Sequence, residues 1–338
     1  ETMVCRNLFT RVALGLAILM LAGCGTKQAG STKLAADGSA DKPSHAEMTA
    51  GAASVKPTPS DAVPGVVLPD TEALQVHDPV GRDYPVWVAL PADYAAHPTQ
   101  RYPVLYVTDA LYSFPLVRSL RNLVGQHGVN LEDFILVGLP PQQGLTSKQS
   151  RSRDYTPSTP VRRSPDDFSA EEYGGAAHYR DFLAATVLPM LDARYRTDPA
   201  RRVFAGHSYG GLFGAYVLVT RPELFHTYIL SSPSLWYDDH VIDRIERNYA
   251  KDHHALHAQV LLSVGSYETF GPGPRYFHQN NMLLHNRSFA QRLRSRHYEG
   301  LEVETSVIDG EDHFTVYPTV LTRALIEIFP GTGPYVSG

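Results

Sequence analysis

From about residue 71 onward, short apolar runs alternate with longer segments whose apolar residues recur at helical spacing. Runs such as PVLYVT and FILVGL are apolar at nearly every position. Strands covered on both faces have this continuous pattern, because neither face meets water. The expected strands are Tyr84–Leu90, Pro103–Thr108, Phe134–Leu139, Arg202–Gly206, Thr227–Ser232, Val260–Gly265 and Val303–Ile308.

Helical spacing predicts four helices among these strands: Ala177–Tyr195, Gly210–Thr220, His278–Arg296 and Tyr317–Phe329. Alternating strands and helices indicate an α/β fold, with a mostly parallel central sheet and helices on both faces. In such sheets, functional side chains gather on loops at the carboxyl ends of strands. These loops are therefore where chemistry is expected.

The first seventy residues follow neither pattern. Residues 1–23 combine basic positions, a short apolar run (Val12–Ala22) and small residues, which is typical of a secretory signal peptide. A membrane-spanning helix would need about 20 apolar residues, and this run is about half that long. Leu21–Cys24, LAGC, resembles the lipobox of bacterial lipoproteins, in which the cysteine is lipidated; an ordinary signal peptide that happens to contain Cys24 is the alternative.

Residues 24–70 are rich in Ala, Gly, Ser, Thr and Pro and have few large apolar side chains. Such a segment buries too little surface to offset its ordering entropy, so we expect a flexible tether. We expect residues 71–338 to form the folded domain. We also expect the protein to be exported and anchored by lipid at Cys24 to a bacterial membrane, on its periplasmic or surface face.

Composition adds two exclusions. The 338 residues are 43% hydrophobic and 19% charged, which is ordinary for a globular protein. A formal charge of −5 argues against nucleic-acid binding, which favours a basic face. The two cysteines are Cys5 and Cys24, so cleavage before Cys24 leaves no internal disulfide.

One stretch, VFAGHSYGGLFGAYVL (Val203–Leu218), leaves an expected strand, turns around Ser208 and enters an expected helix. Its glycines at 206, 210 and 211 remove side chains where strand and helix nearly touch. The pattern G-x-S-x-G in this context is that of a nucleophile elbow. The alternative is a tight glycine turn whose serine only caps the helix.

A serine nucleophile needs a base, and the base needs an orienting acid. Elbow hydrolases place them in the chain order Ser, acid, His. His313, just past the last expected strand, is the predicted base, because the other late histidines fall in helical or polar connecting segments. Glu268, after VLLSVG, is the predicted acid. Its competitors are Asp238, Asp239, Asp309 and Asp312.

An oxyanion needs fixed backbone N–H donors. The amide of Tyr209, which follows the serine, is one expected donor. The second is expected after the early strand in LYVTDALYSF, from either Ala110 or Leu111.

Several of these motifs, in order, resemble the esterase D-type α/β-hydrolases, in the branch that contains the trilactone-cleaving siderophore esterases. They are RSRDYTPS (Arg151–Ser158), the stretch Gly174–Asp239, VGSYE and DGEDHF. The resemblance implies an α/β-hydrolase fold and serine esterase activity without a cofactor or metal, with Ser208, His313 and Glu268 as the catalytic residues. The family's strand-end LDG reads TDA here, with Ala110 in place of glycine.

The resemblance also implies substrate contacts. Arg153 falls where relatives have a substrate-side arginine, although a salt bridge that holds the loop is the alternative. Trp236 is expected either to line the acyl pocket or to lie in the core, and His207 is expected beside the substrate. Pro140–Gly175 reads as a long polar loop with four arginines, either a binding loop or a solvated surface.

The sequence thus predicts a serine esterase acting on a small-molecule ester, with siderophore trilactones as one candidate. Acyl transfer or peptide hydrolysis by the same three residues remains open, as does a lipoprotein that uses this scaffold only for binding.

Overall fold

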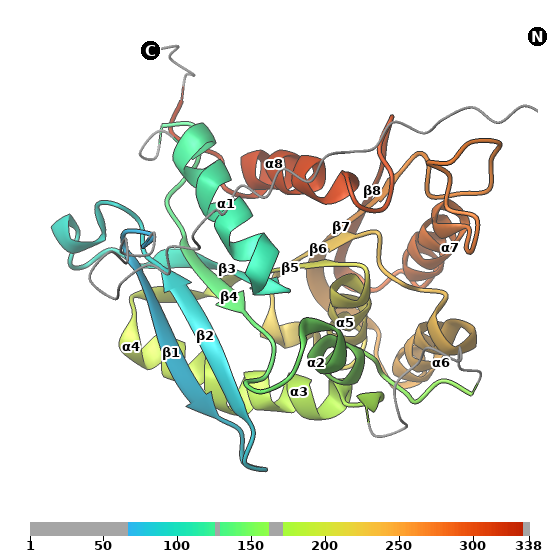
Figure 1. Ribbon diagram of the computed structural model, residues 1–338, viewed down its shortest axis with the longest axis horizontal. Helices are drawn as coiled ribbons and strands as arrows, with labels where there is room; N and C mark the ends of the chain where they lie inside the picture. The colour runs from blue at the N-terminus through green and yellow to red at the C-terminus, as the bar shows by residue number, and fades with distance from the viewer. Residues whose placement is uncertain (1–66, 126–128, 162–171, 334–338) are drawn as a thin grey trace, which may run out of the picture. The chain divides into compact units, whose positions relative to one another are not determined.

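Eight strands form one sheet in the order β1-β2-β4-β3-β5-β6-β7-β8 (Figure 1). The structure, a computed structural model, describes residues 67–125, 129–161 and 172–333. The strands are β1 (Thr71–His77), β2 (Asp83–Ala89), β3 (Tyr102–Thr108), β4 (Ile135–Leu139), β5 (Thr197–His207), β6 (Thr227–Ser231), β7 (Ala255–Gly265) and β8 (Glu299–Ile308). The pairings from β4 through β3, β5, β6 and β7 to β8 are parallel, whereas β1 pairs antiparallel with β2 and β2 pairs antiparallel with β4. The expected mostly parallel sheet is confirmed.

The central strands are buried on both faces, as their continuous apolar pattern requires. All seven residues of β3 are buried. Val104 and Tyr106 pack into the core on one face, whereas Leu105 and Val107 pack into the core on the other. Side chains that alternate between two cores explain why no polar alternation appears in this strand.

Helices cover both faces of the sheet. They are α1 (Ala110–Gly125), α2 (Ser147–Asp154), α3 (Ala176–Phe182), α4 (Leu188–Arg194), α5 (Tyr209–Leu218), α6 (Tyr237–Asp252), α7 (Met282–Ser295) and α8 (Val316–Ile328). Helices α1 and α8 contribute to one core, and α3 to α7 to the other (Figure 1). A π-helical turn, Leu183–Val187, joins α3 to α4, so the single helix expected over Ala177–Tyr195 is nearly continuous.

Four elements were not predicted: β1, α1, α2 and α6. Strand β1 is a half-exposed edge that mixes Glu, Gln and His with its apolar positions. Helix α1 contains Pro115, a residue that usually interrupts helices. Helix α6 begins with three residues of left-handed backbone, Asp238 to His240, which helical periodicity does not anticipate. Strands β5 and β7 begin at Thr197 and Ala255, earlier than expected, because their outer ends carry polar residues.

The loop interpretation of Pro140–Gly175 is wrong for residues 147–154, which form α2. The Thr146 hydroxyl accepts a hydrogen bond from the Gln149 N–H, and the Gln149 side chain accepts one from the Thr146 N–H. This reciprocal capping box stabilises the start of a short polar helix that has no apolar face to signal it. Arg162 and Arg163 lie outside the described residues.

The signal peptide, Cys24 and nearly all of the proposed tether also lie outside the described residues, so these predictions stay predictions. The first strand within the described residues is β1, which begins at Thr71. None of the helices in the described ranges has the length and hydropathy to cross a membrane.

Candidate active site

The turn between β5 and α5 holds Ser208 in a constrained backbone. Ser208 has φ 57° and ψ −116°, a conformation that side-chain-bearing residues rarely adopt. Its N–H donates to the Ser231 carbonyl over 3.0 Å, and its own carbonyl accepts from Leu212 at 2.9 Å and Ser234 at 3.1 Å. The Ser208 side chain makes no capping hydrogen bond to the helix, so the capping alternative is wrong.

Glycines make this turn possible, as the sequence indicated. A β-carbon on Gly206 would overlap the Gly210 carbonyl, and one on Gly210 would overlap the Thr108 hydroxyl. The first and second turns of α5 therefore pack directly on the ends of β5 and β3. This contact fixes the turn at the carboxyl end of β5, where Ser208 lines the pocket.

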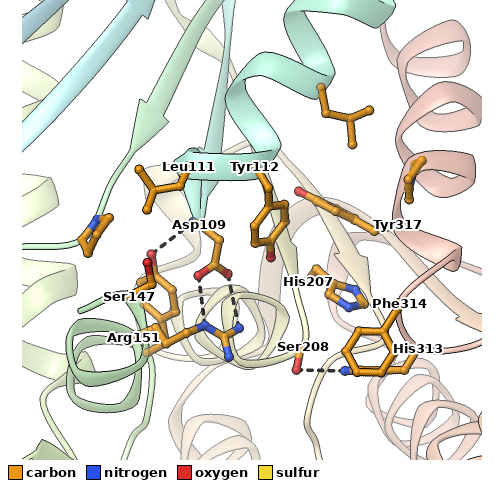
Figure 2. A pocket seen from close by; sticks show the side chains of 14 residues that line it. Asp109, Leu111, Tyr112, Ser147, Arg151, His207, Ser208, His313, Phe314 and Tyr317 are labelled. Atoms are coloured by element: carbon orange, nitrogen blue, oxygen red, sulfur yellow. Dashed lines mark hydrogen bonds and ion pairs between the residues drawn. The ribbon is translucent and has the colours of Figure 1, made fainter. Parts of the chain in front are cut away.

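His313 lies between Ser208 and Glu268, and Figure 2 shows its contact with Ser208. Its Nε2 lies 3.1 Å from the Ser208 Oγ, and its Nδ1 lies 2.6 Å from the Glu268 Oε2. The Glu268 side chain is fully buried, and its other oxygen accepts from Ser232 Oγ at 2.5 Å and from the Gly265 N–H at 2.8 Å. The structure thus brings together the three residues that the sequence singled out.

Two aromatic rings contact the imidazole of His313. The Phe277 ring stacks on it at 5.4 Å between centroids, and the Phe314 ring meets it edge-on at 5.7 Å. Phe277 was not predicted, because its position nine residues after Glu268 carries no recognisable signal. With one nitrogen on a carboxylate and one on a hydroxyl, the ring is oriented for proton exchange with Ser208.

His207 forms part of the site but lies below the surface. Its ring stacks on Tyr317 at 5.1 Å and lies 4.7 Å from His313, and its Nδ1 is 3.2 Å from the Ser231 hydroxyl. Burial, followed by the proximity of His313 and Arg151, holds the pKa of His207 well below its ordinary value. His207 is therefore a neutral wall of the pocket beside the base.

The expected oxyanion donors lie at two helix starts. Tyr209 is the first residue of α5, and Ala110 and Leu111 open α1 directly after Asp109, whose φ is 52°. N–H groups in the first turn of a helix point out of its N-terminal end and carry partial positive charge. Both helix starts border the pocket, since Ser208 and Leu111 line it.

A pocket of about 630 Å³ opens at Ser208. Its wall is mainly apolar, with Leu111, Leu116, Pro141, Tyr317 and Pro318 among the lining residues. Phe314 stands at its edge with 86% of its surface exposed. A cavity of this kind suits a ligand of small-molecule size with few charges.

The arginine that reaches the pocket is Arg151, not Arg153. The Arg151 guanidinium pairs with the Asp109 carboxylate at 3.0 and 3.3 Å (Figure 2). It also lies over the Tyr209 ring, 5.2 Å from the ring centroid. Although burial lowers the pKa of Arg151, the carboxylate of Asp109 raises it overall, so the guanidinium stays charged.

Arg153, the residue carried over from the family resemblance, points elsewhere. Its guanidinium binds Asp154, the Tyr84 hydroxyl and the Gln142 side chain, and it is not among the residues that line the pocket. The salt-bridge alternative thus describes Arg153 correctly. Arg151 and Arg153 lie two residues apart on α2, so their side chains leave different sides of the helix, which the sequence RSR does not reveal.

Trp236 and the competing acids lie outside the pocket lining as well. Trp236 is half-buried, with its ring 6.5 Å from that of Tyr209. Asp238 accepts a hydrogen bond from the Ser158 hydroxyl at 2.6 Å, and Asp312 pairs with Arg275 at 3.0 Å. Asp239 and Asp309 are exposed. The described part of the chain gathers no three His, Cys, Asp or Glu side chains that could hold a metal ion.

The fold and this serine-centred pocket define the class: an α/β hydrolase. Residues 78–328 match the family described as "Putative esterase", so the chain belongs to this esterase family and is a carboxylic ester hydrolase. The matched range includes all three residues of the Ser–His–Glu line.

Individual relatives agree with the family. The chain is 27% identical to the ferri-bacillibactin esterase BesA of Bacillus subtilis, over 76% of this chain and 88% of BesA. It is 30% identical to the siderophore triacetylfusarinine C esterase of Aspergillus fumigatus, over 64% of this chain and 73% of that protein. The solved structure of siderophore hydrolase EstB from Aspergillus nidulans superposes with a TM-score of 0.65 at 26% identity, over 79% of this chain and 98% of EstB.

Proposed function

We propose that this protein hydrolyses the ester bonds of siderophores through an acyl-enzyme on Ser208. The observation that carries the proposal is the position of the His313 ring, with one nitrogen 3.1 Å from the Ser208 hydroxyl and the other 2.6 Å from the Glu268 carboxylate. The siderophore substrate is supported by the names of the relatives, and by the apolar pocket at Ser208.

Acylation begins when the Ser208 oxygen attacks the ester carbonyl carbon and its proton moves to His313 Nε2. The Tyr209 amide, with that of Ala110 or Leu111, stabilises the resulting oxyanion. The C–O bond to the alcohol then breaks, and His313 returns the proton to the departing alkoxide. Glu268 stabilises the transient imidazolium through Nδ1, because its buried carboxylate is fixed by Ser232 and Gly265.

Deacylation repeats the sequence with water. His313 removes a proton from a water molecule, which attacks the acyl carbon. Collapse of the second tetrahedral intermediate returns the proton to Ser208 and releases a carboxylic acid. The net change is one ester and one water converted to one acid and one alcohol.

Three substrates test the proposal: p-nitrophenyl butyrate, an iron-free tris-catecholate trilactone and glycine p-nitroanilide. The proposal predicts cleavage of both esters with release of acid, with the trilactone favoured in kcat/KM, and no turnover of the anilide. Addition of a competing alcohol should change the products little. Ester products dominating in its presence would identify a transferase, and failure to cleave any ester would favour a binding protein.

We further propose that the chain is exported and lipidated at Cys24. The basic residues, short apolar run and LAGC sequence of residues 1–24 support this. Expression of the full chain in a bacterium fed with labelled palmitate tests it. Label should enter the wild type and be lost from Cys24→Ala, whereas equal labelling of both would refute lipidation at this residue.

A further inference from the structure

The pocket at Ser208 has balanced charge. Among the described residues that line it, the charged side chains other than histidine are Asp109 and Arg151. These two form a two-point ion pair, with distances of 3.0 and 3.3 Å, and the Arg151 side chain is only 25% exposed. His207 is held neutral by its burial, and His313 must be neutral to accept a proton. The lining therefore offers a substrate no net positive charge.

Two further arginines in the described part of the chain, Arg275 and Arg153, are also paired with carboxylates. Arg275 binds the carboxylate of Asp312, the residue before the catalytic histidine, and its guanidinium lies over the Tyr267 ring at 4.6 Å. Arg153 binds Asp154 at 2.8 Å. Each of these cations is opposed by one carboxylate, so the site is not an arginine cluster of the kind that binds anions.

The rest of the pocket would penalise an anion. Its wall is mainly apolar, and the exposed Phe314 and Leu111 stand at its edge. Moving a multiply charged anion from water against such surfaces costs free energy unless unpaired cations compensate. The helix starts at Tyr209 and Ala110 carry only partial positive charge, suited to the single charge of an oxyanion.

We propose that the site selects uncharged ester substrates: it cleaves an iron-free siderophore or a neutral iron chelate, and discriminates against an anionic one. This inference rests on the proposed siderophore esterase function and specifies its substrate. Iron(III) held by three catecholates is a trianion, whereas iron(III) held by three hydroxamates is neutral, and the free tris-catechol is neutral near pH 7. One relative is named for an iron-loaded siderophore, ferri-bacillibactin, and another for an iron-free one, apo-salmochelin.

The experiment compares three esters on the full chain: a tris-catecholate trilactone without iron, the same trilactone with iron(III), and a cyclic tris-hydroxamate triester with iron(III). The first two differ in charge on one ester skeleton, and the third controls for the shape that iron imposes. We expect kcat/KM for the trianionic chelate to be at least about tenfold below that of both neutral substrates. Equal or faster cleavage of the trianion would overturn the charge inference and leave the esterase proposal intact.

A matched pair of variants at Ser147 tests the cause. Ser147 lines the pocket on the exposed first turn of α2, so a longer side chain there does not disturb the core. Ser147→Lys should raise the ratio of trianion to iron-free cleavage at least about threefold over Ser147→Gln, and added salt should reduce this gain. An equal ratio in the two variants would overturn the electrostatic explanation. Cleavage of p-nitrophenyl butyrate with none of the three siderophores cleaved would overturn both the siderophore proposal and this inference.

Discussion

The two sides of the pocket differ in how firmly they are held. On the catalytic side, the Glu268 side chain is fully buried and each of its oxygens accepts at least one hydrogen bond. At the edge of the pocket, by contrast, Phe314 is 86% exposed and Leu111 is 53% exposed. The proposed catalytic residues are thus held by buried polar contacts, whereas the side chains at the pocket edge are largely exposed.

This difference teaches which substitutions should matter for which property. Replacing Ser208, His313 or Glu268 should reduce the rate of the chemical step, because that step depends on the alignment of these three side chains. Removing an apolar side chain at the edge should change substrate affinity with little effect on the chemistry.

The largest effect is expected from Ser208→Ala. Loss of the nucleophile should lower kcat by about 10⁴- to 10⁶-fold while the unfolding temperature shifts by no more than about 2 °C. Ser234→Ala is the matched control, since its hydroxyl lies 3.4 Å from that of Ser208, and it should cost less than about tenfold. Ester hydrolysis and thermal unfolding of the two variants measure both effects. Retention of a tenth of the activity by Ser208→Ala would break the comparison.

Glu268→Gln should lower kcat by about 10²- to 10⁴-fold, because an amide in place of the carboxylate cannot stabilise the His313 imidazolium. Asp312→Asn is the control: it neutralises a carboxylate next to His313 in the chain but keeps the oxygen that accepts from Phe314 and Thr315. It should retain activity within about fivefold. If both variants lose kcat to a similar extent, the loss comes from removing negative charge near His313 and not from the specific contact between Glu268 and His313.

Stability near the site should depend on pH through His207. Its pKa is lowered in the folded chain, chiefly by burial, so below about pH 6.5 the unfolded chain binds a proton that the folded chain does not. The free energy of unfolding should therefore fall as the pH drops below about 6.5, by up to about 1.4 kcal/mol per pH unit from this group. Above that pH, His207 is neutral in both states and contributes no slope.

Urea unfolding at several pH values, on the wild type and His207→Asn, measures this contribution. The variant should show a shallower loss of stability between about pH 6.5 and pH 5. A slope equal to that of the wild type would contradict a neutral buried His207.

The smallest effect is expected at the pocket edge. Phe314→Ala should raise KM for aromatic esters by about three- to tenfold, with kcat changed less than about twofold, because the ring offers apolar contact to bound substrate. Phe314→Leu should recover part of the affinity. Steady-state kinetics on phenyl and alkyl esters checks this, and a loss confined to kcat would place Phe314 with the catalytic side instead.

The sequence predicted the parallel part of the sheet and the Ser–His–Glu line well, for a physical reason. Strands buried on both faces carry apolar residues almost without interruption, and the elbow around Ser208 requires glycines that are visible in the sequence. Because Ser208, Glu268 and His313 each follow a parallel strand, they are expected at the same edge of the sheet.

The parts that could not be predicted depend on local bonding or on tertiary contacts. Helix α2 is defined by its capping box and not by apolar periodicity. The sequence therefore could not show that Arg151, and not Arg153, lines the pocket. Strand β1 lies at an exposed edge, and α1 tolerates Pro115 inside a helix. Phe277 reaches His313 through a loop whose path no periodic pattern encodes.

Labelling with a fluorophosphonate, which reacts with activated serine nucleophiles, tests most directly the central claim that Ser208 is the nucleophile. An aligned Ser208–His313–Glu268 line predicts one phosphonyl group per chain, located on Ser208 by peptide mass spectrometry, with ester hydrolysis lost in step with labelling. Labelling at another residue, or full hydrolytic activity after the reagent has been consumed, would contradict it.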